Sequence, residues 1–143
     1  MVADAAPAVA LKLDLLYNLR FKCETLSTMF IHFITTKATS EQMAEMLVEL
    51  ETYVKLAVDV RLGVLAGGGE LHADCEANLL ENGSKQDDIW GADWFPHSEE
   101  TTFESMINIR PGQGNFSMEV QSEDLRLEIR KVAENLLGGV SIG

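Results

Sequence analysis

The alternation of apolar and polar residues along the chain predicts where strands form. In 53–60 every second residue is apolar, which is typical of a strand with one face in the core. Residues 59–63 then suit a turn, so the chain should continue into a hairpin. The short apolar run at 30–34, rich in aromatic and β-branched residues, indicates a buried strand. The predicted strands span 30–34, 53–60, a segment ending at Ala66, 89–95 and 103–110.

Three helices are predicted from their caps and from their apolar stripes. Thr39, followed three residues later by Gln42, is a capping box for the first helix. The second runs from about Glu70 to Glu81, and the third is capped by Ser122 and ends before Gly138. The stripes expected to face the core are Met43, Met46, Leu47 and Leu50 in the first helix, and Leu125, Ile129, Val132 and Leu136 in the third.

The order β-α-β-β-α-β-β-α that results implies an α+β fold. We expect a small, mostly antiparallel or mixed sheet of about five strands, covered by about three helices. Residues 29–143 are predicted to form a single domain, because a chain of this length supports one core.

Residues 1–28 are predicted to be an N-terminal extension. The odd positions of 9–23 are all apolar, which suggests a strand or a hairpin, although Leu11, Leu15 and Leu19 also fit one face of a helix. Two origins stay open for this extension. It is either a real added element, or the result of a start codon assigned too early, with Met29 as the true first residue.

Charge and cysteine content narrow the possible partners and compartment. Eleven Lys and Arg residues face 23 Asp and Glu residues, so the net charge is −12 at pH 7. Without a basic stripe, the chain is not expected to bind nucleic acid or an anionic membrane. Cys23 and Cys75 stand far apart and no secretory signal precedes them, which favours a cytoplasmic location. We also expect a homo-oligomer that shares the N-terminal segment or a face carrying Trp90 and Trp94, although simple core packing of these two rings is favoured.

Three stretches resemble a known family: GGELHAD at 68–74, LLENGSKQDDIWG at 79–91 and INIRPGQGN at 107–115. Through them, residues from about 29 to 138 resemble a family of short prokaryotic proteins described as a domain of unknown function. The resemblance implies a prokaryotic source, a fold grouping and site positions within these stretches, but no activity. Members of the family commonly begin near the strand at 30–34, so this chain departs from them by its N-terminal addition.

The first candidate site begins where the glycine run 67–69 enters the second helix. His72 and Glu76 are four residues apart, which is the spacing of two helix residues that bind one divalent metal ion. The third ligand would come from the following segment: Asp87, Asp88 or His97. The alternative interpretation is a histidine that forms ordinary hydrogen bonds beside a solvated acidic face.

The second candidate site is the polar group Asn108, Arg110, Gln113 and Asn115. If 103–110 is a strand, Asn108 and Arg110 point to the same face. A guanidinium with carboxamides suits a bound carboxylate or phosphate, particularly beside the backbone N–H groups of a helix N-terminus. The alternative interpretation pairs Arg110 with an acid of the 70–76 helix, and uses the amides to bind backbone in a tight turn.

We therefore expect a non-catalytic module that binds a small polar or anionic ligand, or a protein partner, since no pair of nucleophile and base can be named. The predicted ligand-binding residues are Gly68, Gly69, Glu70, His72, Asp74, Asn108, Arg110, Gln113 and Asn115. The alternative is a metal-assisted hydrolase with His72 and Glu76 or Asp74 as metal ligands, in which Arg110 stabilises negative charge. No cofactor is predicted apart from that divalent metal.

Overall fold

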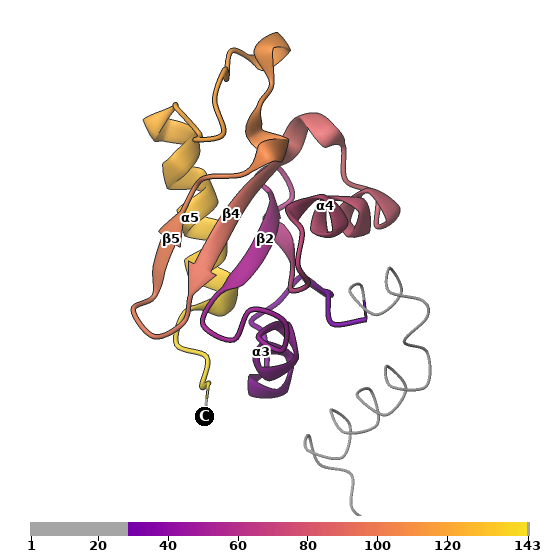
Figure 1. Ribbon diagram of the computed structural model, residues 1–143, viewed down its shortest axis with the longest axis vertical. Helices are drawn as coiled ribbons and strands as arrows, with labels where there is room; N and C mark the ends of the chain where they lie inside the picture. The colour runs from indigo at the N-terminus through magenta and orange to yellow at the C-terminus, as the bar shows by residue number, and fades with distance from the viewer. Residues whose placement is uncertain (1–28, 143) are drawn as a thin grey trace, which may run out of the picture.

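A five-stranded antiparallel sheet lies at the centre of the computed structural model, which describes residues 29–142 (Figure 1). Its strands follow the order β1-β3-β2-β4-β5 across the sheet. They are β1 (His32–Ile34), β2 (Val54–Asp59), β3 (Val64–Gly67), β4 (Ile89–Phe95) and β5 (Glu100–Thr102). The element predicted within 9–23, and Cys23, lie outside the described residues.

Three α-helices and three short 3-10 helices complete the described part of the chain. The α-helices are α3 (Ser40–Met46), α4 (His72–Glu81) and α5 (Glu123–Leu137). The 3-10 helices are η1 (Gln86–Asp88), η2 (Met106–Asn108) and η3 (Pro111–Gln113). The α+β class and the order of strands and α-helices predicted from the sequence are confirmed.

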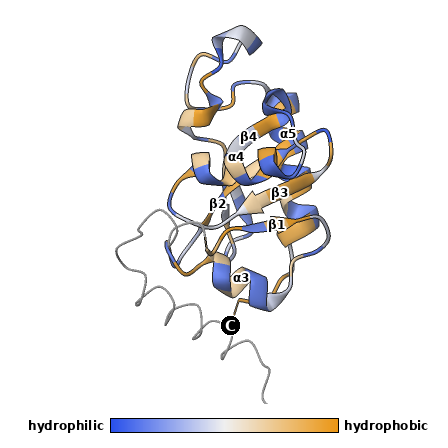
Figure 2. Ribbon diagram, turned by 90° about the vertical axis from the view of Figure 1, so that its right-hand side faces the viewer, coloured by the Kyte–Doolittle hydropathy of each residue, from blue (hydrophilic) through white to orange (hydrophobic). Residues whose placement is uncertain are grey.

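The helices cover both faces of the sheet. On one face the alternating residues of β2, Val54, Leu56 and Val58, pack with α3 and α5 in the larger apolar cluster. On the opposite face, Ala57 packs with Cys75 and Leu79 of α4 in a second cluster. Figure 1 shows α5 and α4 on either side of the central strands, and Figure 2 shows that β1 and β3 are mainly hydrophobic. Because successive residues of β2 point to opposite faces of the sheet, this strand contributes side chains to both apolar clusters.

The helix caps follow the sequence closely. Thr39 and Gln42 form both hydrogen bonds of the capping box at α3, and Ser122 accepts from the backbone N–H of Leu125 at the start of α5. Helix α4, in contrast, begins at His72 and not at Glu70, and its N-cap Leu71 makes no side-chain hydrogen bond. The delay has a local cause: Gly69 has φ +75°, outside the helical region. The capping signals were therefore reliable, whereas the glycine run postponed the helix that follows it.

The strand expected over 103–110 is wrong. The fifth strand is Glu100–Thr102, and the chain then leaves the sheet and forms η2. The reason lies at Gly91 of β4, whose backbone N–H donates to Asn108 Oδ1 at 2.8 Å and whose carbonyl accepts from Asn108 Nδ2 at 3.0 Å. The Asn108 carboxamide thus binds the backbone of β4 at Gly91, in place of the backbone hydrogen bonds that a strand over 103–110 would form.

Trp90 and Trp94 lie on the same face of β4 and belong to the core cluster beneath α5. Trp90 is 5% exposed and Trp94 is fully buried. The favoured interpretation of the two rings as core residues agrees with this burial. None of the helices within residues 29–142 could span a lipid bilayer.

Candidate functional site

Asn108 and Asn115 hold the segment 103–121 in one conformation. The buried Asn108 side chain binds Gly91, and its Nδ2 also lies 3.2 Å from the carbonyl oxygens of both Phe103 and Met118. Its amide therefore joins the two ends of the loop to the sheet. Buried amides that are satisfied this fully make a loop rigid, because moving it would leave polar groups unpaired.

Asn115 performs the same role inside the loop. Its Nδ2 donates to the carbonyl oxygens of Asn108 at 2.8 Å and Glu119 at 2.9 Å, and its Oδ1 accepts from the backbone N–H of Gln121 at 2.9 Å. The backbone of Arg110 also pairs with that of Asn115 in an isolated antiparallel bridge. The two asparagines therefore fix a loop that has little regular secondary structure.

Arg110 directs its guanidinium toward oxygen atoms of the protein itself. Nε donates to the Ile107 carbonyl at 3.0 Å, Nη1 donates to the Gln86 carbonyl at 2.7 Å, and Nη2 donates to the Ile89 carbonyl. The guanidinium also lies over the Trp90 ring, with Cζ 4.6 Å from its centroid. Burial lowers the pKa of Arg110, and nearby carboxylates oppose this shift. A side chain with these contacts connects the loop, η1 and β4.

The acid that faces Arg110 is Glu76 of α4, with Oε2 3.6 Å from Nη2. This contact is the one described by the alternative interpretation of the sequence, in which Arg110 pairs with an acid of the 70–76 helix. Gln113 completes the group: its Oε1 accepts from Arg110 Nη1 at 3.2 Å, and its Nε2 donates to the Asp87 carbonyl at 3.0 Å. The four polar residues of the second candidate site are therefore together, and they bind largely backbone.

The residues of the first candidate site have separate partners. His72 Nε2 lies 2.9 Å from Asp93 Oδ1 and 3.0 Å from the Ala92 carbonyl, whereas Glu76 faces Arg110. Asp88, one of the expected third ligands, pairs with Arg61 at 2.9 Å. Within residues 29–142, no group of three or more His, Cys, Asp or Glu side chains is arranged to hold a metal ion.

The remaining predicted residues lie near the start of α4. The Gly68 N–H donates to the Lys55 carbonyl at 3.1 Å, and the Glu70 carbonyl accepts from Lys55 Nζ at 2.8 Å. A Cβ atom at Gly68 would lie 2.2 Å from the Phe30 carbonyl oxygen, and its φ is +111°, so glycine is required there. Gly69 follows with φ +75°. Asp74 lines a separate cavity of about 280 Å³, together with Ile31, Ala77, Asn78 and Glu81. The glycine run thus has a structural explanation in a close backbone approach.

Comparison with known proteins places the chain in a family. The model of a family described as a protein of unknown function (DUF5674) matches residues 32–136. The chain belongs to the DUF5674 family. No curated protein and no solved structure matches it. The matched range contains every element from β1 to nearly the end of α5, so the whole described fold is that of a DUF5674 domain.

The DUF5674 chain also carries a feature that sequence reasoning missed. Among the described residues, eight large apolar side chains are exposed, and four of them lie in the loop that Asn108 and Asn115 hold: Met106, Ile109, Phe116 and Met118. Met106 is 72% exposed and Phe116 is 69% exposed. The strand predicted over 103–110 contains Met106 and Ile109, whereas the structure has no strand there and both side chains are exposed. The irregular spacing of the four residues, with neither period two nor period 3.6, was the available signal.

Proposed function

We propose that the protein is a non-catalytic module that binds a partner protein through residues 103–121, which we call the docking loop. The observation that carries the proposal is the exposure of Met106 and Phe116 on a backbone fixed by buried amides. Figure 1 shows this loop, in orange, projecting from one end of the molecule beyond the sheet. Exposed apolar clusters on soluble proteins commonly mark sites of interaction.

Rigidity makes such a loop effective in binding. A flexible loop loses conformational entropy when a partner orders it, and that loss weakens the complex. Here Asn108 and Asn115 have already ordered the backbone within the folded protein. Aromatic and methionine side chains are also enriched in the buried centres of protein interfaces. The docking loop therefore offers preordered anchors to a partner.

The charges near the docking loop define the partner's chemistry. Glu104 is exposed, Glu119 pairs with Arg126 at 2.9 Å, and the whole chain has a net charge of −12. Long-range attraction therefore requires a partner whose surface is basic around the apolar site that receives the loop. A second copy of this chain has the same negative charge and would be repelled. We therefore propose that the partner of the docking loop is a different protein.

Two other functions expected from the sequence have less geometric support. A small anion held by Arg110 would compete with the backbone oxygens of Ile107, Gln86 and Ile89. The metal-assisted hydrolase stays a prediction. It is tested by elemental analysis of protein purified without chelator, with His72→Ala as the comparison. The partner-binding function is favoured because it uses side chains that have no packing role.

Site-specific crosslinking in living cells tests the proposed function. A photoreactive phenylalanine analogue replaces Phe116 in one strain and Leu127, which is also exposed but lies on α5, in the other. We expect an adduct of one defined mass from position 116 and none from position 127. An adduct with twice the mass of the chain would assign the loop to self-association and overturn a separate partner. Equal labelling from both positions, or none from 116, would overturn the docking loop.

Purified variants then measure the contribution of the anchors, once the crosslinked partner is identified. The double variant Met106→Ser, Phe116→Ser removes the two most exposed apolar side chains of the loop. We expect partner binding to weaken by about 30-fold or more, because an aromatic hot spot contributes about 2 kcal/mol or more. Leu127→Ser is the matched control, and its affinity should equal that of the wild type. Thermal unfolding should be nearly unchanged in both, since these side chains are exposed.

A further inference from the structure

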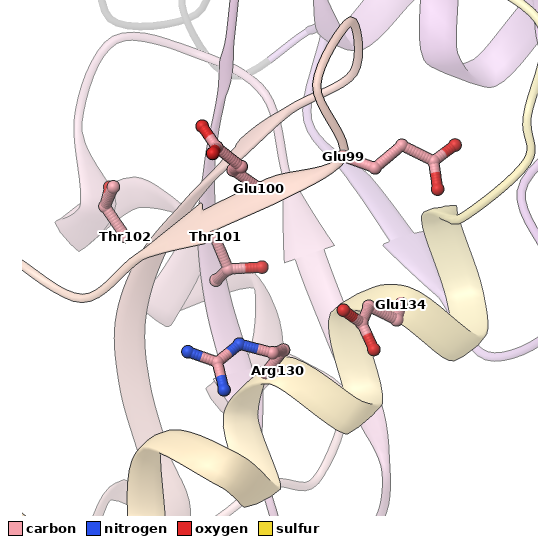
Figure 3. A pocket seen from close by; sticks show the side chains of 6 residues that line it. All are labelled: Glu99, Glu100, Thr101, Thr102, Arg130 and Glu134. Atoms are coloured by element: carbon pink, nitrogen blue, oxygen red, sulfur yellow. The ribbon is translucent and has the colours of Figure 1, made fainter. Parts of the chain in front are cut away.

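A groove lies between the edge strand β5 and helix α5 (Figure 3). Its volume is about 500 Å³, within the range of small-molecule sites. The groove is lined by Glu99, Glu100, Thr101, Thr102, Arg130 and Glu134. Nothing in the proposed partner binding uses these residues.

The side chains that face the helix can be separated from those that do not. In Figure 3 Thr101 points from β5 toward α5, which carries Arg130 and Glu134, whereas Glu100 and Thr102 lie on the other side of the strand. This arrangement follows from the alternation of side chains along a strand. Thr101, Arg130 and Glu134 are therefore the residues that a molecule in the groove would meet first.

Two of these residues lack the partners that such groups usually have. Thr101 Oγ1 is buried and has no hydrogen-bond partner among residues 29–142. The Arg130 guanidinium lies over the Phe103 ring, with Cζ 5.3 Å from the centroid, and no described carboxylate lies within the 4.0 Å of an ion pair. Arg126, which stacks on the same ring, does have such a partner in Glu119 at 2.9 Å. Arg130 is thus positioned by an aromatic face while its hydrogen-bond donors stay available.

The sheet adds one more unpaired group beside Thr101. Trp94 is the residue opposite Thr101 in the β4-β5 register, and its Nε1 is also buried without a partner in the described part of the chain. Buried polar groups in folded proteins almost always have a partner, so each exception requires an explanation. A polar molecule in the groove would supply one for Thr101.

We propose that this groove binds a small zwitterion, a molecule that carries both a carboxylate and an ammonium group. The carboxylate accepts from the Arg130 guanidinium and from Thr101, and the ammonium donates to Glu134. A simple anion would be repelled by Glu99 and Glu134, and a simple cation would leave the Arg130 guanidinium without an anionic partner. A molecule with both charges gives each side chain a complementary partner.

Titration of the full-length, ¹⁵N-labelled protein tests the proposal. The probes are glycine and 4-aminobutanoate, which are zwitterions of different length, with acetate and methylammonium as the single-charge controls. We expect at least one zwitterion to cause saturable shifts at the amides of Thr101 and Glu134 and at the Trp94 indole N–H. Acetate and methylammonium at the same concentrations should cause none. Equal shifts with acetate would make this a simple anion site, and the absence of shifts with both zwitterions would overturn the groove as a site for this class.

Variants test which side chains bind the carboxylate and the ammonium group of the zwitterion. Arg130→Met keeps the packing on Phe103 and removes the charge, and Glu134→Gln keeps the shape. Each should weaken zwitterion binding by about tenfold or more, the usual effect of losing a hydrogen bond to a charged group. Lys131→Met, an exposed position on the same helix, should leave binding unchanged. Thr101→Val should weaken binding without reducing thermal stability, because its hydroxyl is unpaired in the free protein. If Lys131→Met weakens binding equally, the effect is only general electrostatics and the assignment fails.

Discussion

Single carboxamides decide how the docking loop meets the sheet. Asn108 is fully buried and its side chain binds both backbone groups of Gly91, as a neighbouring strand would. No other residue type offers a donor and an acceptor in this geometry except glutamine, whose longer side chain would not fit the same spacing. Asn108 is therefore the residue that joins the docking loop directly to β4 at Gly91.

Replacement of that residue should destabilise the protein. Asn108→Ala leaves the Gly91 N–H and carbonyl without their partner in a buried place, so we expect the free energy of unfolding to fall by about 1–3 kcal/mol. Urea unfolding followed by circular dichroism measures the change. Asn78→Ala, at a half-buried position of α4 whose side chain binds no sheet residue, is the control and should be close to neutral. Equal effects of the two substitutions would contradict the role of Asn108.

A second prediction at the residue scale concerns Cys75 and the dependence of the protein's stability on pH. It is fully buried, and its Sγ donates to the Gly68 carbonyl at 3.1 Å. Burial is the main cause that raises the pKa of Cys75 above its ordinary value of 9.0, and Asp74 contributes in the same direction. The folded state therefore holds the thiol proton more tightly than the unfolded state does.

It follows that the thiol's contribution to stability is fully present below pH 9.0 and is lost as the pH rises above that value. The loss should approach about 1.4 kcal/mol per pH unit once the unfolded thiol is ionised. We expect the wild type to lose stability relative to Cys75→Ala between about pH 9 and 10.5. Urea unfolding of both proteins at a series of pH values measures this difference, and a difference independent of pH would contradict it.

At the scale of elements, local signals were sufficient for most of the chain. The helix caps at Thr39 and Ser122 depend on residues three positions apart, so the sequence contains all the necessary information. The segment 103–110 is different, because its conformation depends on the contact between Asn108 and Gly91 of β4, which are 17 residues apart in the sequence. Its apolar content resembled a strand, but Asn108 and Gly91 meet only in the folded chain.

Gly91 allows the docking loop to approach β4 closely. A Cβ atom at this position would lie 2.5 Å from the Cβ of Ser105 and 3.0 Å from Ile107 Cγ1. We expect Gly91→Ala to lower the free energy of unfolding by about 1–3 kcal/mol through overpacking. Gly112→Ala is the matched control, because no atom lies within 4 Å of its added Cβ. It should be neutral or slightly stabilising, and thermal unfolding of both variants gives the comparison. Similar stabilities would show that the loop is free to move away.

At the scale of the whole molecule, the sequence revealed the polar residues of the candidate site but not their partners. Arg110 binds carbonyl groups near residues 86, 89 and 107 and faces Glu76, so its environment comes from four separate segments. An arginine close to several carboxamides in the sequence is compatible both with a ligand-binding site and with a loop held by hydrogen bonds. Only the packing of α4 and β4 around Arg110 distinguishes the two roles.

The position of β1 at the sheet edge leads to a prediction about the limits of the folding unit. The described core contains Phe30 and Ile34, both buried, and β1 pairs with β3 through His32, Phe33 and Ile34. We expect a fragment of residues 29–143 to unfold cooperatively, because it retains every residue named in the two apolar clusters of the described part of the chain. A fragment of 35–143 is the control, since it lacks β1 and Phe30 and exposes the edge of β3.

The shorter fragment should lose at least about 3 kcal/mol, the usual cost of removing one large buried aromatic side chain. That is a large share of the roughly 5–15 kcal/mol by which domains are stable. Urea unfolding of both fragments, followed by tryptophan fluorescence from the buried Trp94, measures the loss. If 29–143 shows no cooperative transition, residues before Met29 belong to the folding unit. If 35–143 is equally stable, β1 contributes nothing, and the sheet order β1-β3-β2-β4-β5 would not describe the cooperative core.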